Sequence, residues 1–199
     1  VATLVAVDRR TTGIQLEDEG IELRASTRIR EALVDRAHVT VVSYNRQVLI
    51  TGEVPNAQDK AALSTIVGKV ENVRAVVNEV AVMENSSLSS RSKDALTTGR
   101  IKAALVDAKD LYASAFKVVT ERGTVYLMGR VTQREANRAV EIARGVSGVQ
   151  KIIRVFEIIT EEELKAMQPK PPKEDSSKPT PVMTGAGVPL TTNTPVPNK

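Results

Sequence analysis

The chain has 199 residues, a formal net charge of +4 and no cysteine, which excludes internal disulfides and thiolate chemistry and leaves room for one or two small domains. Aromatic residues make up 3% of the chain and Trp is absent, so the cores must be built from aliphatic side chains. No stretch approaches the roughly 18 apolar residues of a transmembrane helix, so we expect no membrane-spanning helix.

An internal repeat organises the sequence. The run VLITGEV at 48–54 returns as VYLMGRV at 125–131, a shift of 77 positions. The match continues downstream and upstream with shifts of 76 and 72 positions, so the copies differ mainly by a five-residue insertion around 109–113. Such a pattern indicates two copies of one folding unit of roughly 70 residues. We therefore place two domains at residues 20–84 and 88–160.

Residues 1–19 precede the first repeat and are expected to form a linker. The segment 1–7, VATLVAV, is small and apolar, and the sequence begins with Val rather than Met. This pattern suggests that an N-terminal targeting region has been removed. Trimming of a longer chain for convenience explains the same start equally well.

Each repeat is predicted to fold in the order helix, strand, strand, helix, strand, which gives an α+β class with a three-stranded mixed sheet packed on two helices. In the second copy, apolar residues at helical spacing predict a helix at 96–106. Two β-rich runs follow, at 116–121 and 125–131. Gly123 between them can supply the positive φ of a tight hairpin, and residues 44–47 take the same place in the first copy.

The second helix of each repeat begins with a capping signal. Thr132 and Glu135 read as a capping box, in which the hydroxyl and the carboxylate satisfy backbone N–H groups at the helix start. In the first copy Asn56 is the predicted N-cap, with Asp59 at the third helical position. These signals fix where the two helices start.

Two glycines stand at equivalent points just before these caps. Gly52 and Gly129 each end a hairpin strand, so we expect a sharp backbone turn or the close approach of a helix there. After the second helix, residues 145–148 read as a helix stop and 149–158 as the last strand.

The character of the sequence changes after the second repeat. Glu161 to Glu163 begin a short helical extension, and eight of the nine prolines lie from Pro169 onward. We expect residues 161–199 to be a short helix followed by a disordered, Pro-rich tail, because few apolar residues offset the entropy of ordering it. A tether and a partner-binding segment are both compatible with this composition.

The positive charge is concentrated in the second repeat. Residues 88–160 contain 13 basic and 7 acidic residues, a net of +6, whereas residues 20–83 contain 8 and 7. Such asymmetry favours an anionic partner for the second domain, with nucleic acid and anionic lipid both candidates, although an ordinary solvated face gives the same counts. Two sets carry the excess: Arg91, Lys93, Arg100 and Lys102 on the first helix, and Arg134, Arg138 and Arg144 on the second.

No motif for catalysis or for a cofactor is present in the sequence. There is no nucleophile paired with a base, no Walker loop and no dinucleotide fingerprint, so we expect no enzyme and no cofactor. His38 is the chain's only histidine and is interpreted as a capping or surface residue rather than a metal ligand. The GxxG at 145–148 matches the backbone clamp of KH domains, but it joins a helix to a strand, so we expect no nucleic-acid partner.

The tandem units, with Gly52-Glu53-Val54 and Gly129-Arg130-Val131 before their second helices, resemble the BON domain. The motif VDRRTTG at 7–13, together with Tyr44-Asn45-Arg46, is similar to the dual BON-domain outer-membrane lipoproteins of the DolP or YraP type. This resemblance covers about 140 residues, counted over the two predicted domains.

The resemblance implies a non-enzymatic periplasmic protein at the outer membrane of a Gram-negative cell. An acylated N-terminal cysteine, absent from this sequence, would anchor it, and residues 1–19 would be the linker after that anchor. The second domain would bind anionic phospholipid such as phosphatidylglycerol and support outer-membrane integrity. The alternative is a scaffold for outer-membrane protein assembly or for cell-wall remodelling machinery.

Carried over by position, the lipid-binding residues lie on the first helix of the second domain: Ala95, Leu96, Thr97, Thr98, Gly99, Arg100 and Lys102. The sequence departs from the family at Ala95, where members can carry an aromatic residue, and an aromatic ring seats well at a lipid interface.

Overall fold

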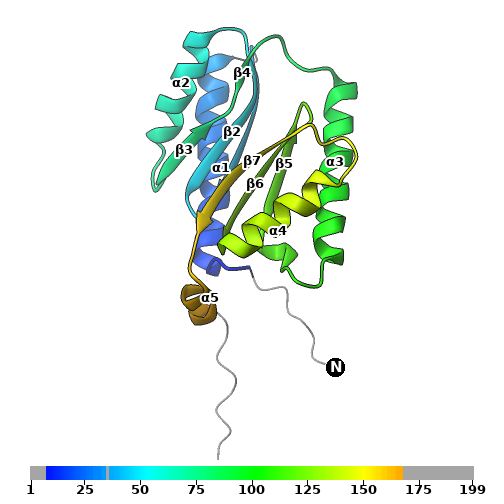
Figure 1. Ribbon diagram of the computed structural model, residues 1–199. Helices are drawn as coiled ribbons and strands as arrows, with labels where there is room; N and C mark the ends of the chain where they lie inside the picture. The colour runs from blue at the N-terminus through cyan, green and yellow to red at the C-terminus, as the bar shows by residue number, and fades with distance from the viewer. Residues whose placement is uncertain (1–7, 35, 168–199) are drawn as a thin grey trace, which may run out of the picture. The chain divides into compact units, whose positions relative to one another are not determined.

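The computed structural model describes residues 8–34 and 36–167 (Figure 1). The segment 1–7 and the Pro-rich tail from residue 168, for which the sequence made predictions, lie outside these residues. Domain 1 comprises α1 (Thr12–Leu33), β1 (His38–Tyr44), β2 (Gln47–Val54), α2 (Ala57–Gly68), β3 (Ala75–Asn78) and β4 (Ala81–Val82). Domain 2 comprises α3 (Leu88–Asp107), the 3-10 turn η1 (Ala113–Ala115), β5 (Lys117–Glu121), β6 (Thr124–Val131), α4 (Gln133–Arg144) and β7 (Lys151–Ile158), followed by α5 (Glu161–Met167). The predicted α+β class and the tandem arrangement are confirmed.

Both sheets are mixed, as predicted. In domain 2 the order is β5-β6-β7, with an antiparallel hairpin and a parallel third strand. Domain 1 has the order β1-β2-β3, with β4 as a fourth strand also paired to β2. Both β3 and β4 run parallel to β2 in one continuous register, from Gln47 opposite Ala75 to Val54 opposite Val82. They are one strand interrupted where the Asn78 side chain accepts a hydrogen bond from the Val80 N–H at 3.2 Å.

The two hairpin turns have the geometry of type I′ turns. Asn45 and Arg46 have φ of 51° and 63°, and Arg122 and Gly123 have φ of 48° and 71°. Positive φ at both central residues matches the twist of the flanking strands, so the predicted hairpins are confirmed. Three of these four residues are not glycine, so other contacts must hold the turns.

Gly52 and Gly129 are required by the close approach of another backbone. A Cβ on Gly52, which has φ of +115°, would lie 2.0 Å from the His38 carbonyl oxygen. A Cβ on Gly129 would lie 2.3 Å from the Ala115 carbonyl oxygen. The expected close approach is therefore real, but it comes from the first residue of β1 at Gly52 and from the 3-10 helix η1 at Gly129 rather than from an α-helix.

Both first helices are longer than expected. Helix α1 begins at Thr12, within the stretch 1–19 that the sequence suggested was a linker, because the Thr11 hydroxyl caps it by accepting from the Ile14 N–H at 3.2 Å. Helix α3 begins at Leu88 rather than residue 96, with Ser87 as its N-cap. The capping box at Thr132 and the cap at Asn56 form as predicted.

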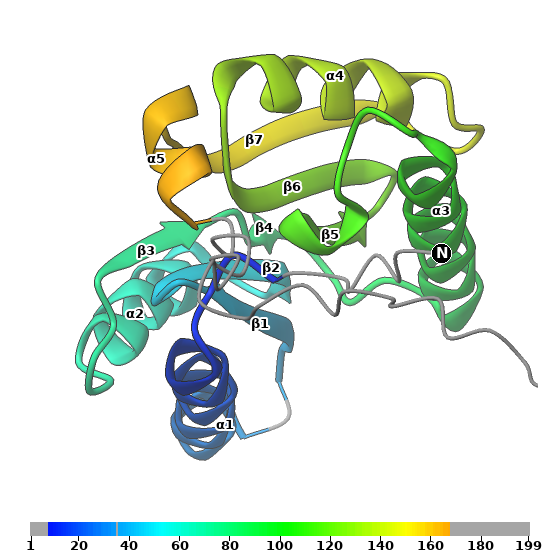
Figure 2. The same cartoon turned by 90° about the horizontal axis from the view of Figure 1, so that it is seen from below.

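The two sheets pack against each other, with the helices on their outer faces (Figure 2). Strand β2 places Val48 and Ile50 in the helix-facing core of domain 1, and β6 places Val125 and Leu127 in that of domain 2. The alternate residues of β2 and β6 face the other sheet and join Tyr44 of β1 and Val155 of β7 in a third core between the sheets, made of Tyr44, Leu49, Tyr126, Met128 and Val155. The molecule is thus layered as helices, sheet, sheet, helices.

The segment before α1 ties the two domains together. Arg9 donates two hydrogen bonds to the Glu135 carboxylate, at 2.7 and 2.6 Å, and one to the Arg130 carbonyl oxygen at 2.8 Å. Arg10 pairs with Asp18 at 2.8 Å. The two arginines of the VDRRTTG motif therefore reach opposite domains, and the motif fixes the start of domain 1 against domain 2.

Candidate functional site

Helix α3 presents one face to the core of domain 2 and leaves the other exposed. Its buried residues are Asp94, Thr97, Ile101 and Leu105, which recur every three or four positions and so lie on one side of the helix. Within the described chain, no helix is both long enough and apolar enough to cross a bilayer. The outer face of α3 is exposed along the length of the helix and is the candidate surface for a contact.

The structure divides the seven predicted lipid-binding residues into two groups. Thr97 is only 4% exposed, and its hydroxyl donates to the Lys93 carbonyl oxygen at 3.0 Å. Thr98 is half-buried, and its hydroxyl donates to Thr120 Oγ1 at 2.8 Å. Both threonines face the domain interior and are not available to a surface ligand. The exposed members are Ala95, Leu96, Gly99, Arg100 and Lys102.

Two further apolar side chains extend the exposed face along the helix. Leu88 is 79%, Leu96 61% and Val106 69% exposed. At 1.5 Å per residue, the strip from Leu88 to Val106 is about 27 Å long. Sequence reasoning missed Leu88 and Val106, yet both sit on the side of the helix opposite the buried residues, and a helical projection of 88–106 would have found them.

Basic side chains flank this strip on both sides. By helical position, Lys93 and Arg100 lie along one flank and Arg91 and Lys102 along the other. Among the described residues, the ammonium groups of Lys93 and Lys102 make no hydrogen bond or ion pair. Arg100 donates only to Ser147 Oγ, at 3.1 Å. The single carboxylate between residues 88 and 106 is Asp94, which is buried, so the outer face is apolar in the middle and cationic at its edges.

The basic residues of α4, Arg134, Arg138 and Arg144, differ from those of α3 because one of them is paired with acidic side chains. Arg138 pairs with Asp110 at 2.9 Å and with Glu141 at 2.8 Å. Arg134 and Arg144 lie on the same exposed face of α4, where the neighbouring Val140 is buried rather than exposed. This face lacks the apolar component that an interfacial helix needs.

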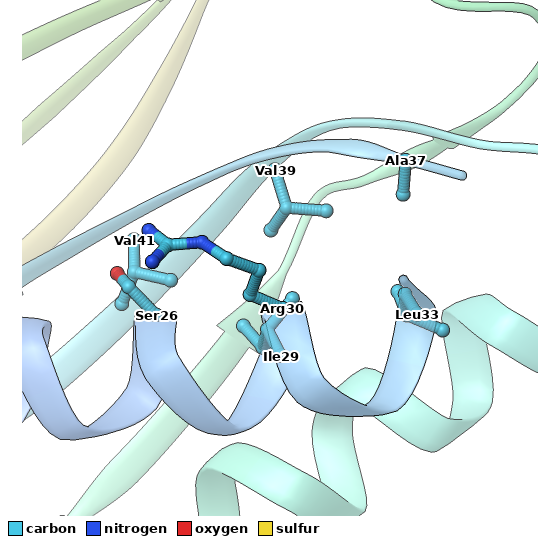
Figure 3. Close-up of a pocket in the computed structure, with 7 residues that line it drawn as sticks. All are labelled: Ser26, Ile29, Arg30, Leu33, Ala37, Val39 and Val41. Atoms are coloured by element: carbon cyan, nitrogen blue, oxygen red, sulfur yellow. The ribbon is translucent and has the colours of Figure 1, made fainter. Parts of the chain in front are cut away.

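A hollow lies between α1 and β1 (Figure 3). Its walls are apolar except for Ser26 and Arg30, whose side chain extends toward Ser26 (Figure 3). The remaining lining residues are Ile29, Leu33, Ala37, Val39 and Val41. They belong to or border the core of domain 1, and no set of convergent polar groups accompanies them.

A charged cluster lies between the sheets, where the sequence had suggested a plain surface histidine. Glu53 is fully buried, and its Oε2 lies 3.1 Å from His38 Nδ1. The Arg122 guanidinium donates to its other oxygen. Burial opposes the charge of Glu53, but hydrogen bonds from Ser86, Arg122 and His38 outweigh it and lower the pKa of this carboxyl.

Glu121 has the opposite shift in the same cluster. Burial, and then the charge of Glu53, raise its pKa to about 7. Sequence reasoning missed this cluster because it joins strands from both repeats. One signal was available: in the antiparallel hairpin of domain 1, His38 stands directly opposite Glu53, and such cross-strand pairs interact.

Comparisons with known proteins agree with the repeat structure. The sequence model described as "BON domain" matches residues 17–84 and 93–160. The outer membrane lipoprotein DolP of Haemophilus influenzae is 38% identical over 161 residues, which cover 80% of this chain and 83% of that protein. A protein named 21 kDa hemolysin, from Actinobacillus pleuropneumoniae, is 32% identical over 155 residues, covering 77% and 80% of the two chains.

Among solved structures, CdsD of the type III secretion system of Chlamydia trachomatis aligns with 73% of this chain and 98% of its own. The identity is 13% and the TM-score is 0.28. No functional inference follows from so low a score.

Proposed function

The chain belongs to the BON-domain family, as an outer-membrane lipoprotein of the dual-domain DolP type, and from this premise we propose that the outer face of α3 binds anionic phospholipid. The proposed ligand surface consists of the apolar residues Leu88, Leu96 and Val106 with the flanking cations Lys93, Arg100 and Lys102. The role is non-enzymatic: domain 2 binds the membrane surface and so supports the integrity of the outer membrane.

One observation carries this proposal. The outer face of α3 combines exposed apolar side chains in its middle with cations on both edges; Asp94 points inward, and the other carboxylate of the helix, Asp107, stands at its C-terminal end. An amphipathic helix of this kind lies in the interface plane, where apolar residues enter the acyl boundary and cations meet anionic headgroups. Lys and Arg side chains also bury their methylene stems along apolar surface while the charge stays in water.

In the proposed mechanism, an acyl anchor and the basic face of α3 each attach the protein weakly to the membrane, and their contributions add. A single acyl chain gives only marginal, reversible membrane binding, and each basic residue near an anionic surface adds about 1 kcal/mol. A lipid-anchored protein that also presents α3 would therefore stay on anionic membrane regions in preference to neutral ones. Ala95 and Gly99 keep the middle of this face shallow, which favours adsorption over deep insertion.

Co-sedimentation with vesicles tests the proposal. The full chain is mixed with phosphatidylglycerol vesicles or with neutral phosphatidylcholine vesicles at several salt concentrations. We compare the wild type with Lys93→Glu/Lys102→Glu, which touches no contact within the domain, and with Arg134→Glu/Arg144→Glu, which changes the charge equally on α4. We expect salt-sensitive binding to the anionic vesicles alone, weakened roughly 30-fold or more by the α3 variant and much less by the α4 variant.

Equal losses in the two variants would mean that net charge, not α3, attracts the membrane. Absence of wild-type binding would refute the proposal and favour the scaffold role in outer-membrane protein assembly or cell-wall remodelling. A third variant, Leu96→Ser/Val106→Ser, keeps the charge and removes the apolar middle, so retained binding there would show that headgroup contact suffices.

A further inference from the structure

The cluster between the domains has the composition of a metal site. His38 on β1, Glu53 on β2 and Glu121 on β5 each bring one potential ligand atom, and these atoms all lie within 4.8 Å of one another. Glu53 is 0% and Glu121 5% exposed. One imidazole and two carboxylates from three different strands are thus held together inside the protein.

The charges within the cluster are not balanced. Glu53 is paired with Arg122, but the Glu121 carboxylate lies 3.9 Å from the same guanidinium, too far for a hydrogen bond. Among the described residues Glu121 makes no hydrogen bond through its carboxylate. The nearby Asp94 is itself occupied, since it accepts from the backbone N–H groups of Arg122 and Gly123 at 2.8 and 2.9 Å.

A buried carboxylate without a hydrogen-bond partner is costly. Arg91 supplies a second positive charge near Glu121, but its Nε donates to Ser86 Oγ at 3.3 Å. The cluster therefore has room for one more cation at the point where His38, Glu53 and Glu121 converge.

We propose that His38 Nδ1, Glu53 Oε2 and a Glu121 carboxylate oxygen bind a divalent transition-metal ion of the zinc class. Bonds of about 2.0–2.2 Å in a tetrahedral site separate neighbouring ligand atoms by roughly 3.4 Å. The 3.1 Å between His38 Nδ1 and Glu53 Oε2 is already close to this value, and Glu121, whose ligand atom lies within 4.8 Å of the others, has to approach by at most about 1.4 Å. The imidazole ligand favours zinc over magnesium and calcium, which prefer oxygen ligands alone.

The surroundings suit such an ion. Arg122 holds Oε1 of Glu53 and so orients Oε2 toward the ion, as hydrogen bonds to metal-binding carboxylates commonly do. To bind the ion, His38 Nδ1 gives up its hydrogen bond to Glu53, and the neutral imidazole carries its proton on Nε2. The fourth position faces a groove lined by Thr40, Ala95 and Thr98, where a water molecule completes the tetrahedron.

The ion would act as a structural link between the two domains. His38 and Glu53 belong to domain 1 and Glu121 to domain 2. The unfolded chain does not bring these residues together, so the ion binds the folded state preferentially and stabilises it. Metal availability in the surrounding compartment would then set how tightly the two sheets are held.

The test uses the full chain without a polyhistidine tag, after treatment with a chelator. Zinc is titrated by calorimetry, and the imidazole is followed by long-range proton–nitrogen NMR, in which His38 gives the single side-chain signal of its kind. We expect one zinc per chain, a metal-induced shift of Nδ1, and a rise in Tm of ~5 °C or more at saturation. The matched variants are His38→Gln and Glu121→Gln, with the exposed Glu141→Gln as control.

Glu121→Gln keeps the shape of the side chain and removes a buried charge, so it folds and separates loss of binding from loss of structure. Binding abolished in His38→Gln and Glu121→Gln but retained in Glu141→Gln supports the site. Binding that survives either substitution overturns the three-ligand assignment. A wild-type dissociation constant weaker than about 0.1 mM overturns the proposal itself.

Discussion

Asp18 and Asp94 occupy the same place in the two repeats, each reaching from the first helix of its domain to the tip of the adjoining hairpin. Asp18 accepts from the N–H groups of Asn45 and Arg46 at 2.8 and 2.7 Å. Asp94 accepts from those of Arg122 and Gly123. Each aspartate therefore holds a turn whose residues have positive φ, which non-glycine residues adopt at a cost.

Removing these carboxylates should destabilise the two domains unequally. Asp94→Ala leaves two backbone N–H groups without their partner, and we expect a loss of about 1–3 kcal/mol. Asp18 also accepts from the Ser43 hydroxyl and pairs with Arg10, so Asp18→Ala should lose about 3 kcal/mol or more. Urea unfolding measures both, with the exposed Asp107→Ala as control. Equal losses for Asp18 and Asp94 would contradict the role given to Arg10 and Ser43.

The stability of the protein should fall in acid partly through Asp18. Burial opposes its charge, but hydrogen bonds from Ser43, Arg46, Arg10 and Asn45 outweigh burial and lower the pKa of Asp18 in the folded state. A carboxyl whose folded pKa is depressed stabilises the fold above its unfolded pKa of about 3.9, and this contribution is lost as the pH falls through that value toward the folded pKa. Asp18→Asn should therefore lower Tm at pH 7 and flatten the decrease in Tm below about pH 5. A variant profile parallel to the wild type would show that Asp18 is not a major source of this dependence.

Gly99 in the middle of α3 should tolerate replacement by alanine, whereas Gly129 in β6 should not. A Cβ on Gly99 meets no atom within 4 Å, so Gly99→Ala should raise the free energy of unfolding by about 0.5–1 kcal/mol. Gly129→Ala would force a Cβ against the Ala115 carbonyl oxygen and should destabilise domain 2. Thermal unfolding compares the two. A destabilised Gly99→Ala variant would mean that α3 is not a regular exposed helix at this position.

Local physics explains why much of the fold could be predicted from the sequence. The hairpins, the caps at Asn56 and Thr132 and the last strands depend on residues that are neighbours in the chain. The start of α1 was missed because Thr11 looks like any other threonine until the helix is seen to continue back to it. The proposed site lies on the helix that the sequence singled out, but the inward position of Thr97 and Thr98 could be seen only once the packing of α3 was known.

The packing of the two sheets against each other was not predicted, although the sequences of β2 and β6 indicate it. VLITGEV and VYLMGRV begin with consecutive apolar residues, VLI and VYLM, and both faces of β2 and β6 are buried, which is typical of a strand covered on both sides. A half-exposed sheet would have shown alternation instead. The partners of His38 and Arg9 depend on this packing, and for that reason no pattern within one repeat could identify them.

The ion pair between Arg9 and Glu135 should be a principal link between the segment before α1 and domain 2. The two side chains are 5% and 2% exposed and meet at 2.6 Å. Arg9→Met removes one partner and leaves a buried carboxylate, so we expect a loss of about 3–5 kcal/mol. Glu135→Gln alone should also be destabilising, because it weakens the capping box of α4 as well.

The double variant separates these effects. With both charges removed, the uncompensated carboxylate disappears, so Arg9→Met/Glu135→Gln should be destabilised by less than the sum of the single variants, with a coupling of about 1–3 kcal/mol. Urea unfolding measures the cycle, and the exposed pair Arg138 and Glu141 provides a reference cycle expected to couple much more weakly, because solvent screens it. Additive losses at Arg9 and Glu135 would mean that the carbonyl of Arg130, which also accepts from Arg9, is the contact that holds this segment to domain 2.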